Sequence, residues 1–498
     1  MSKIEIKQLS FEYGGQTTPL FDHAELNLDT GWKLGLVGRN GRGKTTLLKL
    51  LQGSLPYTGT IQHSLDFVYF PQKLQDKTQL TFYVLTELGN FEQWEIEREL
   101  NLLGVDPDIL WRPFDSLSGG EKTKVLLAQL FTDEQHFPLI DEPTNHLDIA
   151  GREQVATYLN RKRQGYIVVS HDRFFLDQVV DHILAIDKTK LRLYQGNFST
   201  YEEQKRLQDE FEQAQNEKLQ REIGRLKQTA AEKAEWSRSR EGDKAKKRTG
   251  FIDTENRRVN KGAVGADAAR TMKRSKAIVQ RLNTQVAEKE KLLKDIEYVE
   301  PLRISYQPSH HRQLLRVEDL KLRYAEPLFQ PLTFEVNQGE QVALVGRNGS
   351  GKSSIIQALL GTFTGEVTGT IHLPPVTVSY VRQNYEDNRG SLQSFAEENQ
   401  LDYQDFLWNL QKLGMEREVF TQLIEQMSMG QRKKVELAKS LATPAELFIW
   451  DEPLNYLDVF NHQQIEALLL DVRPTLLVVD HDQSFLQKVA TREIQLEQ

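Results

Sequence analysis

Five short motifs occur twice along this chain of 498 residues, in the same order and at nearly the same spacing. The first reads GRNGRGKTT from Gly38 to Thr46 and GRNGSGKSS from Gly346 to Ser354, so its two lysines are 308 residues apart. The other four pairs lie 310 or 311 residues apart and read FPQ and VRQ, LSGGEKTKV and MSMGQRKKV, LIDEPTNHLD and IWDEPLNYLD, and SHD and DHD. Five motifs in register indicate a duplicated domain. We therefore expect domain one at residues 1–203, a linker at 204–300 and domain two at 301–498.

The first motif follows an apolar stretch and precedes a helical one in each copy, which is the setting that the phosphate-binding pattern G-x-x-x-x-G-K-[ST] requires. Glycines let backbone N–H groups wrap around phosphate oxygens, and the helix start adds a positive dipole. The lysine is expected to reach the β and γ phosphates of ATP, and the following hydroxyl to bind Mg²⁺. The predicted nucleotide contacts are Gly38, Asn40, Gly41, Gly43, Lys44, Thr45, Thr46, Gly346, Asn348, Gly349, Gly351, Lys352, Ser353 and Ser354.

An Asp-Glu pair ends an apolar strand in each half of the chain. We expect the aspartate to help hold Mg²⁺ and to lie beside the nucleotide, and the glutamate to orient and polarise the attacking water. The repeated glutamine is expected to bridge the metal and the water, and the repeated histidine to contact the γ phosphate. The predicted metal contacts are Thr45, Gln72, Asp141, Ser353, Gln383 and Asp451, and the predicted catalytic residues are Glu142, Glu452, His171, His481, Gln72 and Gln383.

Tyr13 and Tyr324 precede the loop lysines by 31 and 28 residues and are expected to stack on adenine. Two alternatives stay open at this point, because either tyrosine could pack in the core and Phe11 competes with Tyr13.

Basic charge is concentrated in the linker. Residues 221–281 carry 18 Lys and Arg against 8 Asp and Glu, although the whole chain has a formal net charge of −8. Apolar residues at three- and four-residue steps, among them Leu207, Phe211, Ile223 and Val286, predict two long helices, and the stretch from about 241 to 269 is expected to form a loop at their tip. An excess this large favours contact with nucleic-acid phosphates over a merely solvated face. The candidate phosphate contacts are Lys244, Lys246, Lys247, Arg248, Arg257, Arg258, Lys261, Arg270, Lys273, Arg274 and Lys276. The tip also carries the apolar residues Phe251, Ile252, Val259 and Val264.

LSGGE followed by DEPTNHLD resembles the ATP-binding-cassette superfamily. The resemblance implies an α/β fold of two tandem cassettes joined by a long α-helical hairpin. It also implies a monomer whose cassettes dock head to tail around two ATP molecules, so that each phosphate loop faces the other cassette's signature. The signature residues that are expected to contact nucleotide are Ser118, Gly119, Gly120, Ser428, Gly430 and Gln431.

Two cassettes, a linker of about a hundred residues and the motif YQGNFSTY resemble the ABC-F class of ribosome-acting ATPases, and EQWE, LWRPF and MSMGQRKKVE are most similar to its Lsa type. The resemblance implies binding to the bacterial 70S ribosome at the E site, with contacts to 23S rRNA and P-site tRNA. It implies protection of the peptidyl transferase centre against lincosamides, streptogramin A and pleuromutilins. The alternatives are a general factor for stalled ribosomes and the ATPase subunit of an efflux transporter.

The absence of cysteine excludes disulfides and thiolate-bound zinc, and no apolar run is long enough to cross a membrane. We expect a soluble, cytoplasmic, ribosome-associated protein. One departure from the cassette pattern is MSMGQ, which places Met429 where a glycine usually lies, and the second copy also has Leu454 and Tyr456 in place of Thr and His. We therefore expect two active but unequal sites, with the site of Lys44 the less ordinary.

Overall fold

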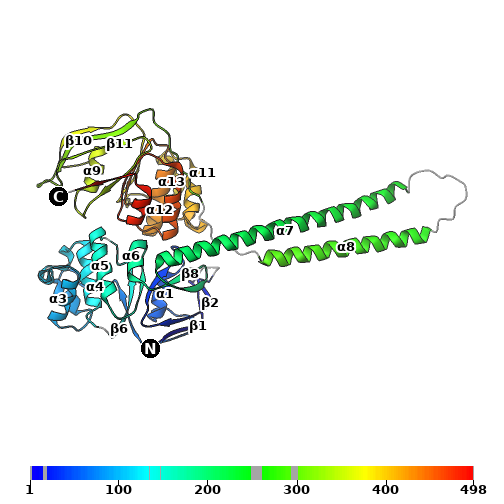
Figure 1. The fold of residues 1–498 in the computed structure, drawn as a ribbon, viewed down its shortest axis with the longest axis horizontal. Coiled ribbons are helices and arrows are strands. Elements are labelled where there is room, and N and C mark those ends of the chain that lie inside the picture. Colours follow the sequence, from blue (N-terminus) through cyan, green and yellow to red (C-terminus); the bar gives the residue numbers. More distant parts are fainter. Residues whose placement is uncertain are drawn as a thin grey trace. The chain divides into compact units, whose positions relative to one another are not determined.

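The computed structural model describes residues 3–14, 19–133, 135–145, 147–247, 261–292 and 301–496. The chain forms two compact units, of which one contains Met1–Tyr201 with Val299–Gln498 and the other is Glu202–Tyr298 (Figure 1). These boundaries fall two residues before the expected ones at 203 and 300. We call the described residues up to 201 cassette 1, and those from 301 onward cassette 2.

Cassette 1 is built on a six-stranded sheet in which β9 alone runs antiparallel to its neighbour. The strand order is β5 (Asp66–Phe70), β6 (His136–Asp141), β7 (Tyr166–Val169), β3 (Lys33–Val37), β8 (His182–Asp187) and β9 (Lys190–Gln195). All four residues of β7 are buried, because helices or a second sheet cover both faces of the parallel strands. The second sheet is antiparallel, with the order β2 (Phe21–Asp29), β1 (Lys3–Phe11) and β4 (Thr58–Gln62).

Two hydrophobic clusters fill cassette 1, one on each side of the main sheet. One cluster joins the antiparallel sheet to α1 (Lys44–Leu51). The other joins the opposite face to a helical subdomain and to the helices that follow it. These elements are α2 (Thr81–Thr86), α3 (Gln93–Leu102), η1 (Pro107–Trp111), η2 (Phe114–Ser116), α4 (Gly119–Leu130), α5 (Ile149–Arg161) and α6 (Arg173–Val179).

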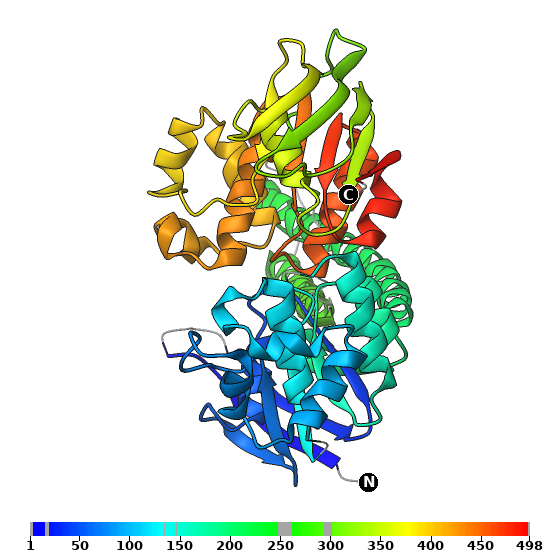
Figure 2. The same cartoon turned by 90° about the vertical axis from the view of Figure 1, so that its left-hand side faces the viewer.

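Cassette 2 repeats this plan with a five-stranded parallel main sheet. Its order is β14 (Val378–Val381), β15 (Leu447–Asp451), β16 (Leu476–Val479), β12 (Gln341–Val345) and β17 (Arg492–Gln495). The antiparallel sheet, coloured green to yellow in Figure 2, has the order β11 (Leu332–Asn337), β10 (Gln313–Arg323) and β13 (Glu366–His372). The helices are α9 (Lys352–Leu359), α10 (Leu392–Glu398), α11 (Tyr403–Lys412), η3 (Arg417–Thr421), η4 (Ile424–Gln426), α12 (Met429–Ala442), α13 (Val459–Val472) and α14 (Gln483–Val489).

The unit between the cassettes consists of α7 (Phe198–Lys247), which begins at the end of cassette 1, and α8 (Lys261–Leu292). The two helices pair through Glu222 with Lys289 at 2.5 Å, and Ile223 and Val286 are buried. Leu207 and Phe211 of the expected apolar stripe are instead 52% and 63% exposed. They lie more than two turns before Glu222, whose partner Lys289 belongs to the last turn of α8.

The expected tip loop at 241–269 is wrong at both ends, because α7 continues to Lys247 and α8 begins at Lys261. Gly242 and Gly262 therefore lie inside helices. A glycine costs a helix only about 1 kcal/mol relative to alanine, which flanking Glu, Lys and Ala residues can outweigh. Arg248, Phe251, Ile252, Arg257, Arg258 and Val259 lie outside the described residues, as do the side chains of Lys244, Lys246, Lys247, Lys261, Val264 and Arg270.

Candidate functional site

The two GRNG loops connect β3 to α1 and β12 to α9. Gly43 and Gly351 cap the helices with φ of 92° and 89°, a left-handed conformation that glycine adopts without strain. Nζ of Lys44 donates to the carbonyl of Gly38 at 2.7 Å, and Nζ of Lys352 donates to the carbonyl of Gly346 at 2.8 Å. Burial lowers the pKa of both lysines. Each loop therefore surrounds a buried ammonium group with backbone, as a phosphate-binding site requires.

The first carboxylate of each acidic pair lies against the start of the loop helix. Oδ2 of Asp141 accepts hydrogen bonds from the hydroxyls of Thr45 and Tyr69, both at 2.7 Å. Asp451 is 1% exposed, and burial raises its pKa to about 6. A hydrogen bond with the side chain of Ser353 acts on this pKa in the opposite direction. A hydroxyl with one carboxylate is the oxygen donor set that suits Mg²⁺, whose remaining positions go to phosphate and water.

The second carboxylate of each pair faces the repeated histidine. Oε1 of Glu142 lies 3.3 Å from Nε2 of His171, and Oε1 of Glu452 lies 3.5 Å from Nε2 of His481. Both glutamates have positive φ, 55° and 48°, and their N–H groups donate to the neighbouring strand, which fixes this strained turn. Burial and the charge of Asp141 raise the pKa of Glu142 to about 8. Burial acts on Glu452 in the same direction, but hydrogen bonds from His481 and Gln383 bring its pKa below the usual value.

The two repeated glutamines, which were both expected to bridge metal and water, do not lie alike in this structure. Nε2 of Gln383 donates to Oε1 of Glu452 at 2.9 Å. Nε2 of Gln72 donates instead to Oε1 of Gln129 on α4, also at 2.9 Å. Lys439 stands 310 residues after Gln129 and is paired with Glu436 at 2.6 Å. At this position cassette 1 therefore has an amide oxygen that accepts from the glutamine, whereas cassette 2 has a lysine.

The signature residues begin α4 and α12 and are fixed by reciprocal capping. Ser118 and Glu121 exchange hydrogen bonds with each other's backbone, and Ser428 and Gln431 do the same. A cavity of about 530 Å³ is lined by residues of both cassettes, namely Asn40, Gly41, Glu142 and His171 with Ser428, Gly430 and Gln431. We call this composite site 1.

Site 2 is the site that combines the phosphate loop of cassette 2 with the signature of cassette 1. A cavity of about 480 Å³ is lined by Tyr324, Asn348, Gly349, Gly351, Lys352, Ser353, Ser354, Gln383, Glu452 and His481, together with Leu147 and Arg152 of cassette 1. A neighbouring cavity of about 540 Å³ is lined by Ser118, Gly119 and Gly120 together with Asn348. Each loop therefore shares a cavity with the signature of the other cassette.

Two aspartates that the sequence analysis did not single out join the cassettes directly. The N–H of Asn40 donates to Oδ2 of Asp458 at 2.7 Å, and the N–H of Asn348 donates to Oδ2 of Asp148 at 3.1 Å. Both aspartates also cap the helix that follows them. The available signal was their place at the end of a repeated motif, in the acidic position that typically begins a helix.

Burial distinguishes Phe11 from the two tyrosines that were expected to stack on adenine. Phe11 is 8% exposed and belongs to the core, whereas Tyr13 and Tyr324 are 41% and 54% exposed. The hydroxyl of Tyr13 lies 2.9 Å from Oγ1 of Thr46. The two tyrosines therefore remain available to a ring placed beside the loops.

Comparison with known proteins agrees with this geometry. The ABC transporter family model matches residues 21–145 and 329–455, once in each cassette. The ribosome protection protein VmlR of Bacillus subtilis (strain 168) is 30% identical over 504 residues, which cover 99% of this chain and 86% of that protein. The chain belongs to the ABC-F family of ATPases. It therefore binds and hydrolyses ATP.

Two further proteins are similar to this chain. The erythromycin resistance ATP-binding protein MsrA of Staphylococcus epidermidis is 28% identical over 505 residues, which cover 99% of this chain and 98% of that protein. The archaeal ribosome recycling factor aABCE1, solved in complex with the stalk protein aP1, has a TM-score of 0.64 and 20% identity, and covers 99% of this chain and 87% of that one. That likeness is one of fold. In the part of this ABC-F chain that the structure describes, no helix is long and apolar enough to cross a bilayer.

Proposed function

We propose that this ABC-F ATPase binds the bacterial 70S ribosome in its ATP-bound form and protects the peptidyl transferase centre from antibiotics. The observation that carries the proposal is the match to the ribosome protection protein VmlR over 99% of the chain. The match includes both cassettes and the helices between them, so it covers the segment on which ribosome contact depends.

Closure of the cassettes around two ATP molecules prepares the binding form. Lys44 and Lys352 bind the phosphates, and the signature serines and glycines complete each site from the opposite cassette. Bound Mg²⁺ would be held by Thr45 with Asp141 and by Ser353 with Asp451, and would neutralise phosphate charge during transfer. Glu142 and Glu452 orient the attacking water, and the adjoining histidines fix the glutamate carboxylates.

Ribosome contact depends on the unit between the cassettes. Lys273, Arg274 and Lys276 are exposed on α8, in a segment whose Lys and Arg outnumber its acidic residues. Phosphate contacts of this kind weaken with salt because they release condensed counterions. The closed protein enters the E site beside P-site tRNA, the tip between α7 and α8 points toward the drug site and displaces the drug indirectly, and hydrolysis releases the protein into the cytoplasm.

The proposed drugs are lincosamides, streptogramin A and pleuromutilins, on the Lsa-like segments EQWE, LWRPF and MSMGQRKKVE. The similarity to an erythromycin resistance protein makes erythromycin the informative comparison drug. Loss of lincomycin but not erythromycin from bound ribosomes supports the Lsa-type spectrum.

The test is co-sedimentation of the double variant Glu142→Gln, Glu452→Gln with ribosomes, with ATP, at two salt concentrations and with each drug. ATP-dependent binding that weakens at high salt and removes lincomycin from the ribosomes is the expected result. Binding without loss of either drug favours a general factor for stalled ribosomes. No binding at either salt concentration contradicts the ribosomal function.

A further inference from the structure

Arg152, in the first turns of α5, contacts both cassettes. Its Nε donates to the carbonyl of Leu147 at 3.2 Å, and its Nη1 donates to Oδ2 of Asp172 at 2.9 Å. The same Nη1 donates across the interface to the carbonyl of His481 at 3.3 Å. The side chain is only 15% exposed and lines the cavities of both site 1 and site 2.

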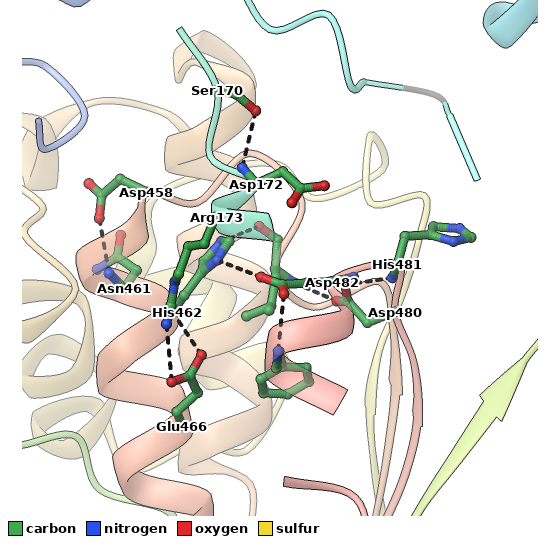
Figure 3. A network of polar contacts seen from close by, with 12 residues as sticks. Ser170, Asp172, Arg173, Asp458, Asn461, His462, Glu466, Asp480, His481 and Asp482 are labelled. Atoms are coloured by element: carbon green, nitrogen blue, oxygen red, sulfur yellow. Dashed lines mark hydrogen bonds and ion pairs between the residues drawn. The ribbon is translucent and has the colours of Figure 1, made fainter. Parts of the chain in front are cut away.

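The contact across the interface lies beside the proposed catalytic pair of site 2. Nε2 of His481 faces Oε1 of Glu452. The backbone N–H of His481 donates to Oδ1 of Asp480 within cassette 2 at 2.7 Å (Figure 3). Arg152 thus holds the carbonyl of the residue whose own N–H is already fixed. With both sides of its peptide backbone held, His481 has less freedom to turn away from Glu452.

The start of α5 therefore completes site 2 in two places. Asp148, which caps the helix, binds the phosphate loop at the N–H of Asn348, and Arg152 binds the histidine loop one turn later. We propose that Arg152 is a positioning residue for ATP hydrolysis at site 2, where it acts through the backbone of His481. This inference rests on the proposed roles of Glu452 and His481 and is independent of ribosome binding.

The duplicated chain contains its own comparison for this role. The position 310 residues after Arg152 is His462, on α13. Its Nδ1 lies 3.3 Å from Oδ2 of Asp482, and its Nε2 lies 3.2 Å from the carbonyl of Leu454, both residues of its own cassette (Figure 3). An imidazole ring is shorter than an arginine side chain and is already engaged by these two groups.

The histidine loop of cassette 1 is held across the interface by a different arginine. Arg173, two residues after His171, pairs with Glu466 of α13 at 2.8 Å, and the two side chains are 5% and 7% exposed (Figure 3). Gln483 of cassette 2 corresponds to Arg173, and Ala156 of cassette 1 corresponds to Glu466. Glutamine and alanine cannot form an ion pair. Site 2 consequently depends on Arg152 in a way that site 1 does not depend on His462.

Single-site parents separate the two sites without ribosomes. Glu142→Gln leaves site 2 to turn over and Glu452→Gln leaves site 1, and Arg152→Ala, Arg152→Lys and Arg161→Ala are placed in each. Arg161 is an exposed residue near the end of the same helix and serves as the matched control. We expect Arg152→Ala to lower kcat about tenfold in the Glu142→Gln parent, with KM for ATP changed less than about twofold. In the Glu452→Gln parent we expect kcat to fall less than about twofold.

Arg152→Lys keeps a cationic donor and is expected to restore most of the site 2 rate, whereas loss of packing alone would not be restored. Equal losses in the two parents, or no loss in either, would overturn the inference. If Arg152→Ala does not fold, Arg152→Met takes its place, because it keeps an extended side chain without the cationic donor. A fall in kcat confined to the Glu142→Gln parent then supports the role, and equal proportional losses in the two parents contradict it. An inactive Glu142→Gln parent would instead contradict the proposed role of Glu452.

Discussion

The backbone nitrogen of Asn40 lies 2.7 Å from Oδ2 of Asp458, a residue 418 positions further along the chain. The same aspartate caps α13 by accepting from the N–H of Asn461 at 2.9 Å. One carboxylate therefore stabilises a helix in cassette 2 and holds the phosphate loop of cassette 1. Position of the loop and pairing of the cassettes are consequently coupled in site 1.

Asp458→Ala is expected to lower ATP affinity at site 1 because it removes a hold on the phosphate loop, in addition to a cap loss of about 1 kcal/mol. The control is Asp402→Ala, because Asp402 caps α11 through two backbone N–H groups and lies outside the cavities of both sites. Nucleotide titration of the Glu452→Gln parent measures the ATP affinity, and thermal unfolding measures the stability that is lost with the helix cap. Equal ATP affinity in the two variants would contradict the coupling.

The two proposed catalytic glutamates are expected to contribute unequally. Glu452 receives a hydrogen bond from Gln383 at 2.9 Å, whereas Gln72 is engaged by Gln129 at the same distance. Met429, 41% exposed, also replaces a glycine in the signature that faces site 1. Site 2 should therefore turn over faster.

Glu452→Gln is expected to lower the steady-state rate of phosphate release by at least about tenfold, and Glu142→Gln by no more than about threefold, because loss of a general base typically costs 10² to 10⁴ at the site it serves. Equal losses would mean that the different glutamine positions have no kinetic consequence. Gln129→Ala provides a further check, since releasing Gln72 is expected to raise the rate that remains in the Glu452→Gln parent.

Local patterns predicted the strand and helix at each phosphate loop and the strand before each acidic pair, because each of these depends on a few adjacent residues. GRNGRGKTT and the apolar residues before it predict a buried strand, a glycine turn and the start of a helix. The same pattern occurs in both halves of the chain, so each prediction is supported twice. The tandem α/β cassettes were implied by the resemblance to the ATP-binding-cassette superfamily.

Individual contacts between residues far apart in the sequence were not predicted. The direction of Gln72 is decided by Gln129 on another helix, and the roles of Asp148 and Asp458 depend on loops of the opposite cassette. The helix ends in the linker were misplaced because a glycine-containing stretch was expected to form a loop, although the residues around Gly242 and Gly262 favour a helix. The pattern of residues within one cassette does not determine contacts with the other cassette.

A buried ionic network in cassette 2 should make stability depend on acid pH. Glu436 is 0% exposed and is bound by Arg382 at 3.0 Å and by Lys439 at 2.6 Å. Burial opposes its ionisation, but these cations hold the pKa of Glu436 at about 2, below its usual 4.5. The carboxylate therefore stabilises the fold fully above pH 4.5, and this contribution is lost as the pH falls through the folded-state pKa of about 2.

Glu436→Gln is expected to destabilise the chain by about 3 kcal/mol at pH 7 and to flatten the loss of stability below pH 4.5. The urea unfolding midpoint, measured from pH 3 to pH 7, checks both effects. The control is Glu386→Gln, because Glu386 is exposed. A variant whose midpoint falls as steeply with acid as that of the parent would show that other groups carry the pH dependence.

The exposed cations of α8 should affect ribosome binding and leave ATP hydrolysis unchanged. Changing Lys273, Arg274 and Lys276 together to alanine removes three positive charges and is expected to weaken sedimentation with ribosomes. The slope of log binding constant against log salt concentration should become shallower by up to about two or three. The matched control changes three exposed lysines of cassette 1, Lys3, Lys7 and Lys190. Both triple variants should hydrolyse ATP without ribosomes at the parent rate, since none of these residues lines site 1 or site 2. If the two triple variants bind ribosomes equally well, contact is made elsewhere on the protein, and the charge of this helix serves only its solvation.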